Sequence, residues 1–189
     1  MTQFLVETVE GRESVAWLDL CCGTGRALIQ AAECFRDRGM ASQVSLLGID
    51  LVDMFAAVPA GIENLTLKTA SIHDWRPAHA FDLVTCVHGL HYVGDKLGLI
   101  TRAASWLRRN GLFAAHLDLR NVKLVGGKSA NAQLGKQFKR LGLEYDRRRH
   151  IVSCHGYRRI AFPFHYVGAD DEGSPNFTHQ PAVDSYYEP

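Results

Sequence analysis

The chain has 189 residues, 47% of them hydrophobic, which suits one globular domain with a sizeable core and leaves little room for a second. Its 21 Lys and Arg residues nearly balance its 20 Asp and Glu residues, which argues against a protein built mainly to hold nucleic acid or an anionic membrane by charge. No stretch approaches the roughly 20 apolar residues of a membrane helix, and the first residues lack the pattern of a signal peptide. We therefore expect a cytoplasmic protein with a small-molecule partner.

Short apolar runs alternate with helical periodicity over the first 120 residues. Strands are predicted at residues 15–20, 43–50, 65–68, 81–87 and 112–117. Helices are predicted at residues 26–38, near 53–58 and at 95–107, the last closed by a turn at 109–111. Because the strands are nearly all apolar, they indicate a parallel sheet covered by helices on both faces, which is an α/β doubly wound fold.

The pattern changes after about residue 120. A polar connection at 121–129 leads to a predicted helix at 130–141. Runs at 143–152 and 159–167, separated by a turn-like His155-Gly156-Tyr157, predict an antiparallel hairpin that closes the sheet. Side chains alternate faces along such strands, so we interpret the arginines at 147–149 as a solvated edge and disfavour nucleic acid as a partner. Residues 169–189 form an acidic tail without a reliable period, and we place the domain boundary after residue 168.

Five cysteines are odd in number and widely scattered, so their spacing predicts neither a disulfide framework nor a zinc site. We expect reduced thiols that mostly pack in the core, and no metal ion. The adjacent Cys21 and Cys22 are interpreted as packing rather than redox chemistry.

The stretch LDLCCGTGRAL, residues 18–28, places two glycines where a strand runs into a helix, as nucleotide-binding turns do. A dinucleotide fingerprint needs a third glycine for close helix packing, and Leu28 occupies that position. Asp19, near the end of the strand, would be unfavourable beside phosphates but useful beside an amine-bearing ligand. The stretch therefore predicts a ligand that carries a positive charge.

These residues resemble the first motif of the class I S-adenosylmethionine-dependent methyltransferases, specifically the small-molecule group that includes ubiquinone-type and trans-aconitate-type enzymes. Cys21 stands where that family usually has glycine. The likeness spans about residues 16–117: Gly48-Ile49-Asp50 resembles the second motif, residues 70–75 fall at the third, residues 81–87 look like the fourth strand, and residues 111–113 resemble the loop into the fifth. The resemblance implies a Rossmann-like, mostly parallel seven-stranded sheet, with residues 1–168 as the methyltransferase domain.

The resemblance also implies the cofactor, S-adenosylmethionine, and the residues around it. The glycine turn would accommodate its methionine part, Asp19 would bind the ammonium group directly or through water, and Asp50 would bind both ribose hydroxyls. The family's adenine contact lands on Ser71, and Asp74 is the alternative. The full predicted cofactor set is Asp19, Cys21, Cys22, Gly23, Thr24, Gly25, Asp50, Leu51, Ser71, Ile72, Asp74 and Val87.

Methyl transfer from a sulfonium needs mainly the placement of the acceptor in line with the methyl group. In the family the segment after the fourth strand faces the acceptor, so His88 and His91 are candidates for a general base and Tyr92 for shaping the pocket. Residues 86–89 lack the Asn or Asp, prolines and aromatic residue that accompany amino methylation of a base. An O-directed or carboxylate-directed reaction on a small molecule is therefore favoured.

Only about 15 residues precede the first strand, so we expect other segments to cover the site. The candidates are residues 121–129 and the aromatic tail at 177–187, which would serve as a lid or as the interface of a homodimer.

Two alternatives to the enzyme stay open. One is a regulatory or partner protein that binds S-adenosylmethionine without transferring the methyl group, and the other is a nicotinamide-dependent oxidoreductase, which Leu28 disfavours.

Overall fold

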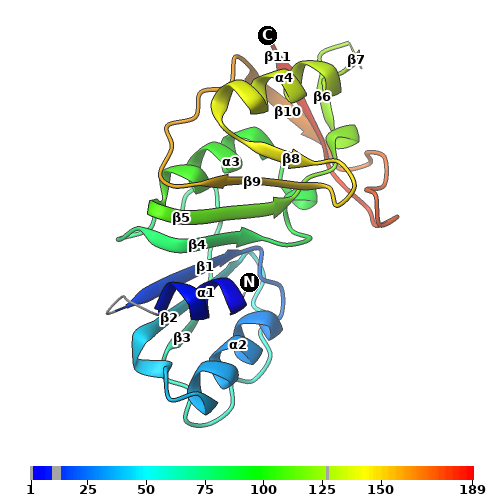
Figure 1. Ribbon diagram of the computed structural model, residues 1–189. Helices are drawn as coiled ribbons and strands as arrows, with labels where there is room; N and C mark the ends of the chain where they lie inside the picture. Colours follow the sequence, from blue (N-terminus) through cyan, green and yellow to red (C-terminus); the bar gives the residue numbers. More distant parts are fainter. Residues whose placement is uncertain (1, 10–13, 127) are drawn as a thin grey trace.

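A computed structural model of the chain describes residues 2–9, 14–126 and 128–189 and contains two sheets (Figure 1). The larger sheet has seven strands in the order β3-β2-β1-β4-β5-β9-β8. The first five strands along the chain run parallel to one another, β9 is antiparallel to β5, and β8 is antiparallel to β9 at the edge of the sheet. The bounds are β1 Val15–Leu20, β2 Val44–Asp50, β3 Leu65–Thr69, β4 Phe81–Cys86, β5 Leu107–His116, β8 Glu144–Asp146 and β9 Ile151–His155.

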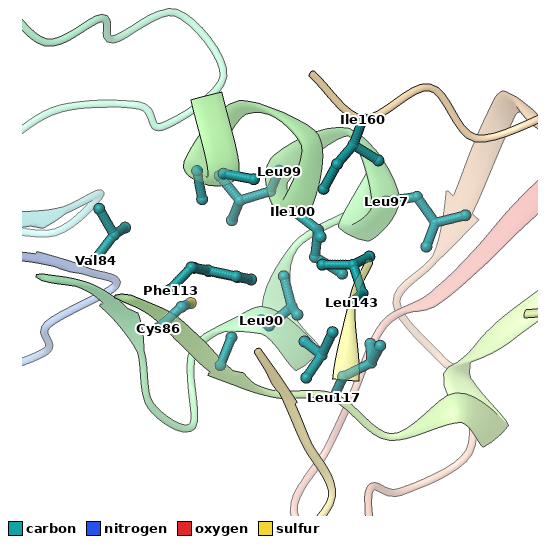
Figure 2. Close-up of a cluster of buried hydrophobic side chains, with 14 of the residues drawn as sticks. Val84, Cys86, Leu90, Leu97, Leu99, Ile100, Phe113, Leu117, Leu143 and Ile160 are labelled. Atoms are coloured by element: carbon teal, nitrogen blue, oxygen red, sulfur yellow. The ribbon is translucent and has the colours of Figure 1, made fainter. Parts of the chain in front are cut away.

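Helices pack against both faces of this sheet. They are α1 Thr2–Val9, α2 Arg26–Asp37, α3 Lys96–Ser105 and α4 Asn131–Leu141, with short 3-10 turns η1 Ala41–Gln43, η2 Leu90–Tyr92 and η3 Leu119–Asn121. Successive side chains of a strand point to opposite faces. In β1, Trp17 accordingly packs with α1 and α2, whereas Leu18 joins the cluster formed with α3 and α4. Figure 2 shows part of that second cluster, with Cys86 of β4 beside Phe113 of β5.

The predicted fold class is confirmed: the sheet is mostly parallel, doubly wound and closed by an antiparallel hairpin. The strands of its parallel part start and end within a few residues of the predicted positions, apart from the earlier start of β5. No helix in the described part of the chain is long and apolar enough to cross a membrane.

The prediction of the hairpin strands was wrong. The hairpin joins β8 to β9, and its turn lies at 147–150 rather than at 155–157. The Asp146 carboxylate accepts the backbone N–H groups of Arg148 and Arg149 at 2.9 and 3.0 Å, which stabilises a turn at this point. The arginine run is therefore an exposed turn and not part of a strand.

Two further local predictions also failed. Residues 53–58 form no helix; the backbone N–H of Ala56 donates instead to Thr24 O at 2.9 Å, and Pro59 disfavours a helical residue before it. The expected turn at 109–111 lies inside β5, where the pairing with β4 shifts register. A Cβ on Gly111 would lie 2.8 Å from Phe81 O, so glycine permits this close approach of the two strands.

The second sheet was not predicted. It has four strands in the order β10-β11-β6-β7, with bounds β6 Val122–Leu124, β7 Lys128–Ser129, β10 His165–Asp170 and β11 Asp184–Glu188. Tyr187 of β11 is buried, accepts the backbone N–H of Leu97 at 3.0 Å and donates to Asp95 Oδ1 at 3.1 Å. The C-terminal segment thus packs against α3.

Candidate functional site

A cavity of about 710 Å³ lies at the carboxyl ends of the parallel strands. Open α/β sheets bind their ligands at this edge. The segments that follow β1, β2, β3 and β4 all contribute to its lining: Cys21, Cys22, Gly23, Thr24, Asp50, Leu51, Val52, Met54, Ser71, Ile72, His73, Val87, His88, Gly89, Tyr92 and Val93. The cavity therefore collects residues from four places in the sequence.

The turn after β1 is tied to the end of β2. Cys21, Gly23 and Gly25 have positive φ values of 52°, 56° and 73°, a region that favours glycine and costs Cys21 some backbone strain. The Gly23 N–H donates to Asp50 Oδ2 at 2.7 Å, and the Val52 N–H donates to Asp50 Oδ1 at 3.2 Å. The Asp50 carboxylate thus fixes the turn while it lines the cavity.

Asp19 lies beneath this turn and is only 6% exposed. Thr85 Oγ1 donates to Asp19 Oδ1 at 2.5 Å, and Trp17 Nε1 donates to the same Thr85 oxygen at 2.7 Å. The pKa of Asp19 is raised to about 7, mainly by burial. The hydrogen bond from Thr85 lowers this pKa, and the nearby negative charge of Asp50 contributes to raising it. Asp19 does not line the cavity itself, so its carboxylate is separated from the cavity by the turn.

The loop after β3 forms another wall of the cavity. Ser71 and the largely buried Ile72 line it, whereas Asp74 does not. The Ser71 hydroxyl accepts the backbone N–H of His73 at 3.3 Å, which leaves its own proton free to be donated.

The predicted catalytic residues are separated by the structure. His88 and Tyr92 are exposed and line the cavity, but His91 is 3% exposed and does not. Burial and the positive charge that His88 and Lys96 can carry lower the pKa of His91 to about 4. Among the described residues, nothing bonds to His91 Nε2.

Further rings extend from His88. His116 and His150 were not predicted as site residues, whereas Phe177 belongs to the aromatic tail that was predicted as a lid or interface. The ring of His116, at the end of β5, has its centroid 4.4 Å from that of His88. Phe177 lies 5.7 Å from His116 and stacks on His150, with centroids 4.3 Å apart and planes within 6°. We call His88, His91, His116, His150 and Phe177 the ring cluster. Within the described ranges, no group of three or more His, Cys, Asp or Glu residues is arranged to hold a metal ion.

A second cavity, of about 380 Å³, is lined by His150 together with Tyr145, Arg120 and Arg147. The ring cluster therefore contributes His88 to the first cavity and His150 to the second.

Most of the predicted cofactor set lines the first cavity; Asp19, Gly25 and Asp74 do not. The first cavity is also lined by residues that were not predicted: Val52, Met54, His73, Gly89 and Val93. Their proximity in the chain to predicted residues was the available signal. His116 and His150 gave no such signal, because they come from separate elements, whereas Phe177 lies in the aromatic tail that was predicted as a lid or interface.

Comparisons with known proteins agree with this geometry. A family model described as a methyltransferase domain matches residues 2–161. The DhpI–SAH complex superposes with a TM-score of 0.51 and 19% identity, covering 80% of this chain and 81% of that one. The YcgJ protein from Bacillus subtilis gives a TM-score of 0.50 and 14% identity, with 98% and 94% covered. At these identities the likeness shows a shared fold.

Other matching structures are longer. A coclaurine N-methyltransferase bound to N-methylheliamine and SAH has a TM-score of 0.46 and 15% identity, and the match covers 61% of this chain but 33% of that one. The chain thus spans about a third of that protein's length. No curated protein matches the sequence.

Proposed function

Because the chain belongs to the methyltransferase-domain family, whose members use S-adenosylmethionine, we propose that it transfers a methyl group from this cofactor to a small molecule. The enzyme class and cofactor implied by the motifs are confirmed by the family match. The main structural support for the proposal is the hydrogen bond from the Gly23 N–H to the Asp50 carboxylate. Both residues line a cavity formed at the ends of four parallel strands.

The residues present fit this cofactor. The carboxylate of Asp50 faces the cavity and keeps lone pairs for the two ribose hydroxyls while it holds the Gly23 N–H. The methionine part would lie along the turn at 21–25, with its ammonium group above the buried Asp19. Ser71 lines the cavity and Asp74 does not, which favours Ser71 as the adenine contact. Leu51, Ile72 and Val87 supply apolar surface for the adenine ring.

The cofactor supplies an activated methyl group, so the protein mainly has to place an acceptor. His88 is the candidate general base, because it is exposed, lines the cavity and lies beside His116. His91 is buried behind it and is better suited to positioning His88, their ring centroids being 6.4 Å apart. A neutral imidazole at this place would accept a proton from a hydroxyl acceptor, or orient a carboxylate.

Phe177 supports the proposal that residues 169–189 act as a lid over a domain formed by 1–168. Its ring lies close to the rings of His88, His116 and His150, so it lies beside the proposed acceptor side of the cavity without lining the cavity itself. A truncation after Gly168 would not test this, because it also removes the buried Tyr187. A change at Phe177 alone does.

Titration calorimetry with S-adenosylhomocysteine tests the cofactor site. Removing the carboxylate in Asp50→Ala eliminates charge-assisted hydrogen bonds, so affinity should fall by roughly 100-fold or more. Asp50→Asn keeps the side chain's size and should also bind poorly. Asp53→Ala, an exposed carboxylate outside the cavity lining, is the matched control and should bind normally.

Normal binding by both Asp50 variants would refute the proposed site. Binding of NADH in place of S-adenosylhomocysteine would favour an oxidoreductase. Tight binding without turnover of any phenol or carboxylic acid in a panel would favour a partner protein without transfer activity.

A further inference from the structure

Two cysteines from distant parts of the sequence meet at the cofactor cavity. Cys21 directly follows β1, and Cys86 is the last residue of β4. These strands are parallel neighbours in which Asp19 pairs with Thr85, so both cysteines lie at the same edge of the sheet. Cys21 is half-buried and lines the cavity, whereas Cys86 is buried beneath it among the apolar side chains of Figure 2.

Gly89 shows how closely the two side chains approach. A Cβ on Gly89 would lie 3.1 Å from Cys86 Sγ and 3.2 Å from Cys21 Sγ, and would also collide with Cys21 Cβ. Both sulfur atoms therefore surround one small space that glycine leaves open. The two thiols are within hydrogen-bonding reach of each other, and all five cysteines are free thiols here.

We propose that Cys21 and Cys86 form a peroxide-sensitive thiol pair, whose oxidation to a disulfide closes the cofactor site. The effect on the cofactor rests on the proposed function, whereas formation of the bond does not. Each thiol loses one hydrogen as the S–S bond forms, and the peroxide is reduced by these two electrons and two protons to water.

The order of the two steps follows from exposure. Cys21 borders the cavity, so a peroxide reaches it first. The Cys21 thiolate attacks one peroxide oxygen, the O–O bond breaks, and a sulfenic acid forms while the hydroxide that leaves takes up a proton to become water. The sulfur of Cys86 then attacks the Cys21 sulfur, and the second water leaves. The hydrogen bond to Cys21 and burial raise the pKa of Cys86, so this thiol, which is also shielded from the cavity, does not react with the peroxide first.

The neighbouring Cys22 is a natural internal comparison. It also lines the cavity, but burial and the charges of Asp19 and Asp50 raise its pKa to about 12. Little thiolate exists there at neutral pH, so we expect that Cys22 can be reached by peroxide but does not react with it.

A disulfide would disturb the turn that holds the cofactor. The S–S bond is about 2.05 Å long, shorter than a thiol contact, so Cys21 must move toward β4. The Cys22 N–H donates to Ile49 O and the Gly23 N–H to Asp50, so a shift at Cys21 acts directly on both bonds. Conversely, a cofactor lying on the turn covers Cys21 and should slow its oxidation.

The experiment treats the full chain with hydrogen peroxide and maps disulfides by mass spectrometry after blocking free thiols. A Cys21–Cys86 link is expected, with Cys22 blocked and reduced. Affinity for S-adenosylhomocysteine should fall by roughly tenfold or more and return with dithiothreitol. Cys86→Ala and Cys86→Ser should bind S-adenosylhomocysteine as the unmodified protein does and keep this affinity after peroxide. Cys154→Ala, another buried thiol, should stay sensitive.

Bound S-adenosylhomocysteine should slow formation of the link. The proposal is overturned if no Cys21–Cys86 link forms, or if the link forms without loss of affinity for S-adenosylhomocysteine. It is also overturned if peroxide treatment lowers the affinity of the Cys86 variants for S-adenosylhomocysteine as much as it lowers that of the unmodified protein. Because the link is mapped without any ligand, its presence in a chain that binds no S-adenosylhomocysteine would refute the proposed function and leave the thiol pair established.

Discussion

The ring of Phe177 stacks on that of His150, with centroids 4.3 Å apart and planes within 6°. His150 lies in the turn between β8 and β9, and Phe177 lies between β10 and β11, so this contact joins the two sheets beside the proposed acceptor site.

Phe177→Ala should raise KM for the acceptor up to about tenfold, because an aromatic pair contributes about 0.5–1.5 kcal/mol. Affinity for S-adenosylhomocysteine should not change, since Phe177 does not line the cofactor cavity. Steady-state kinetics and calorimetry measure the two effects. Tyr157→Ala, at an exposed aromatic residue, is the control. An unchanged KM would remove Phe177 from the acceptor site.

His88→Asn should lower kcat by about 100-fold, the usual contribution of a general base. Asparagine tolerates the positive φ of 55° at this position, so the loop should keep its shape. His91→Asn should lower kcat less, because His91 does not reach the cavity. Equal losses of kcat in both variants, measured by steady-state kinetics, would contradict the assignment of His88 as the base.

Affinity for S-adenosylhomocysteine should weaken as the pH falls through about 7, the pKa to which burial raises Asp19. A protonated Asp19 cannot attract the ligand's ammonium group, so affinity should drop about tenfold per pH unit below that value. Calorimetry between pH 5.5 and 8.5 would show this as a slope. Asp19→Asn should flatten it, and Thr85→Val should move its midpoint upward, because the hydrogen bond from Thr85 lowers the pKa of Asp19. The same slope in Asp19→Asn would rule out this role.

Lys96 connects α3 to the C-terminal segment. It is 1% exposed, and its Nζ donates to Val93 O, Val183 O and Ser185 Oγ at 2.9, 2.6 and 2.9 Å. Lys96→Ala should lower the free energy of unfolding by about 2–3 kcal/mol near pH 9, because buried acceptors lose their donor. Urea denaturation measures this, with the exposed Lys136→Ala as control.

The destabilisation should depend on pH. Burial lowers the pKa of Lys96 from 10.5 to about 7, so between these values the unfolded chain binds more protons than the folded one. The Lys96 contribution to stability therefore rises with pH across this window and is smallest below pH 7. If Lys96→Ala lowers the free energy of unfolding by the same amount at pH 6 and at pH 9.5, burial does not lower the pKa of Lys96 as described.

The sequence was sufficient to predict the parallel part of the large sheet and most of the residues of the predicted cofactor set that line the first cavity. Each short apolar strand ends in a recognisable turn, and parallel strands bring their carboxyl ends to one edge, so Gly23 and Asp50 could be placed together from their positions alone. The residues at 53–58 are helix formers locally, but contact with the glycine turn at Thr24 and the proline that follows prevented a helix there.

The amino-acid sequence by itself determined the fold class, the glycine turn and the placement of Asp19 and Asp50 at the same edge of the sheet, because these depend on local pattern and on the order of neighbouring strands. Only the tertiary structure decided which histidine faces the cavity, that Phe177 stacks on His150 and that Cys21 meets Cys86. These contacts join segments whose separation in the chain carries no periodic signal, and they exist only because the sheet order and the second sheet bring them together.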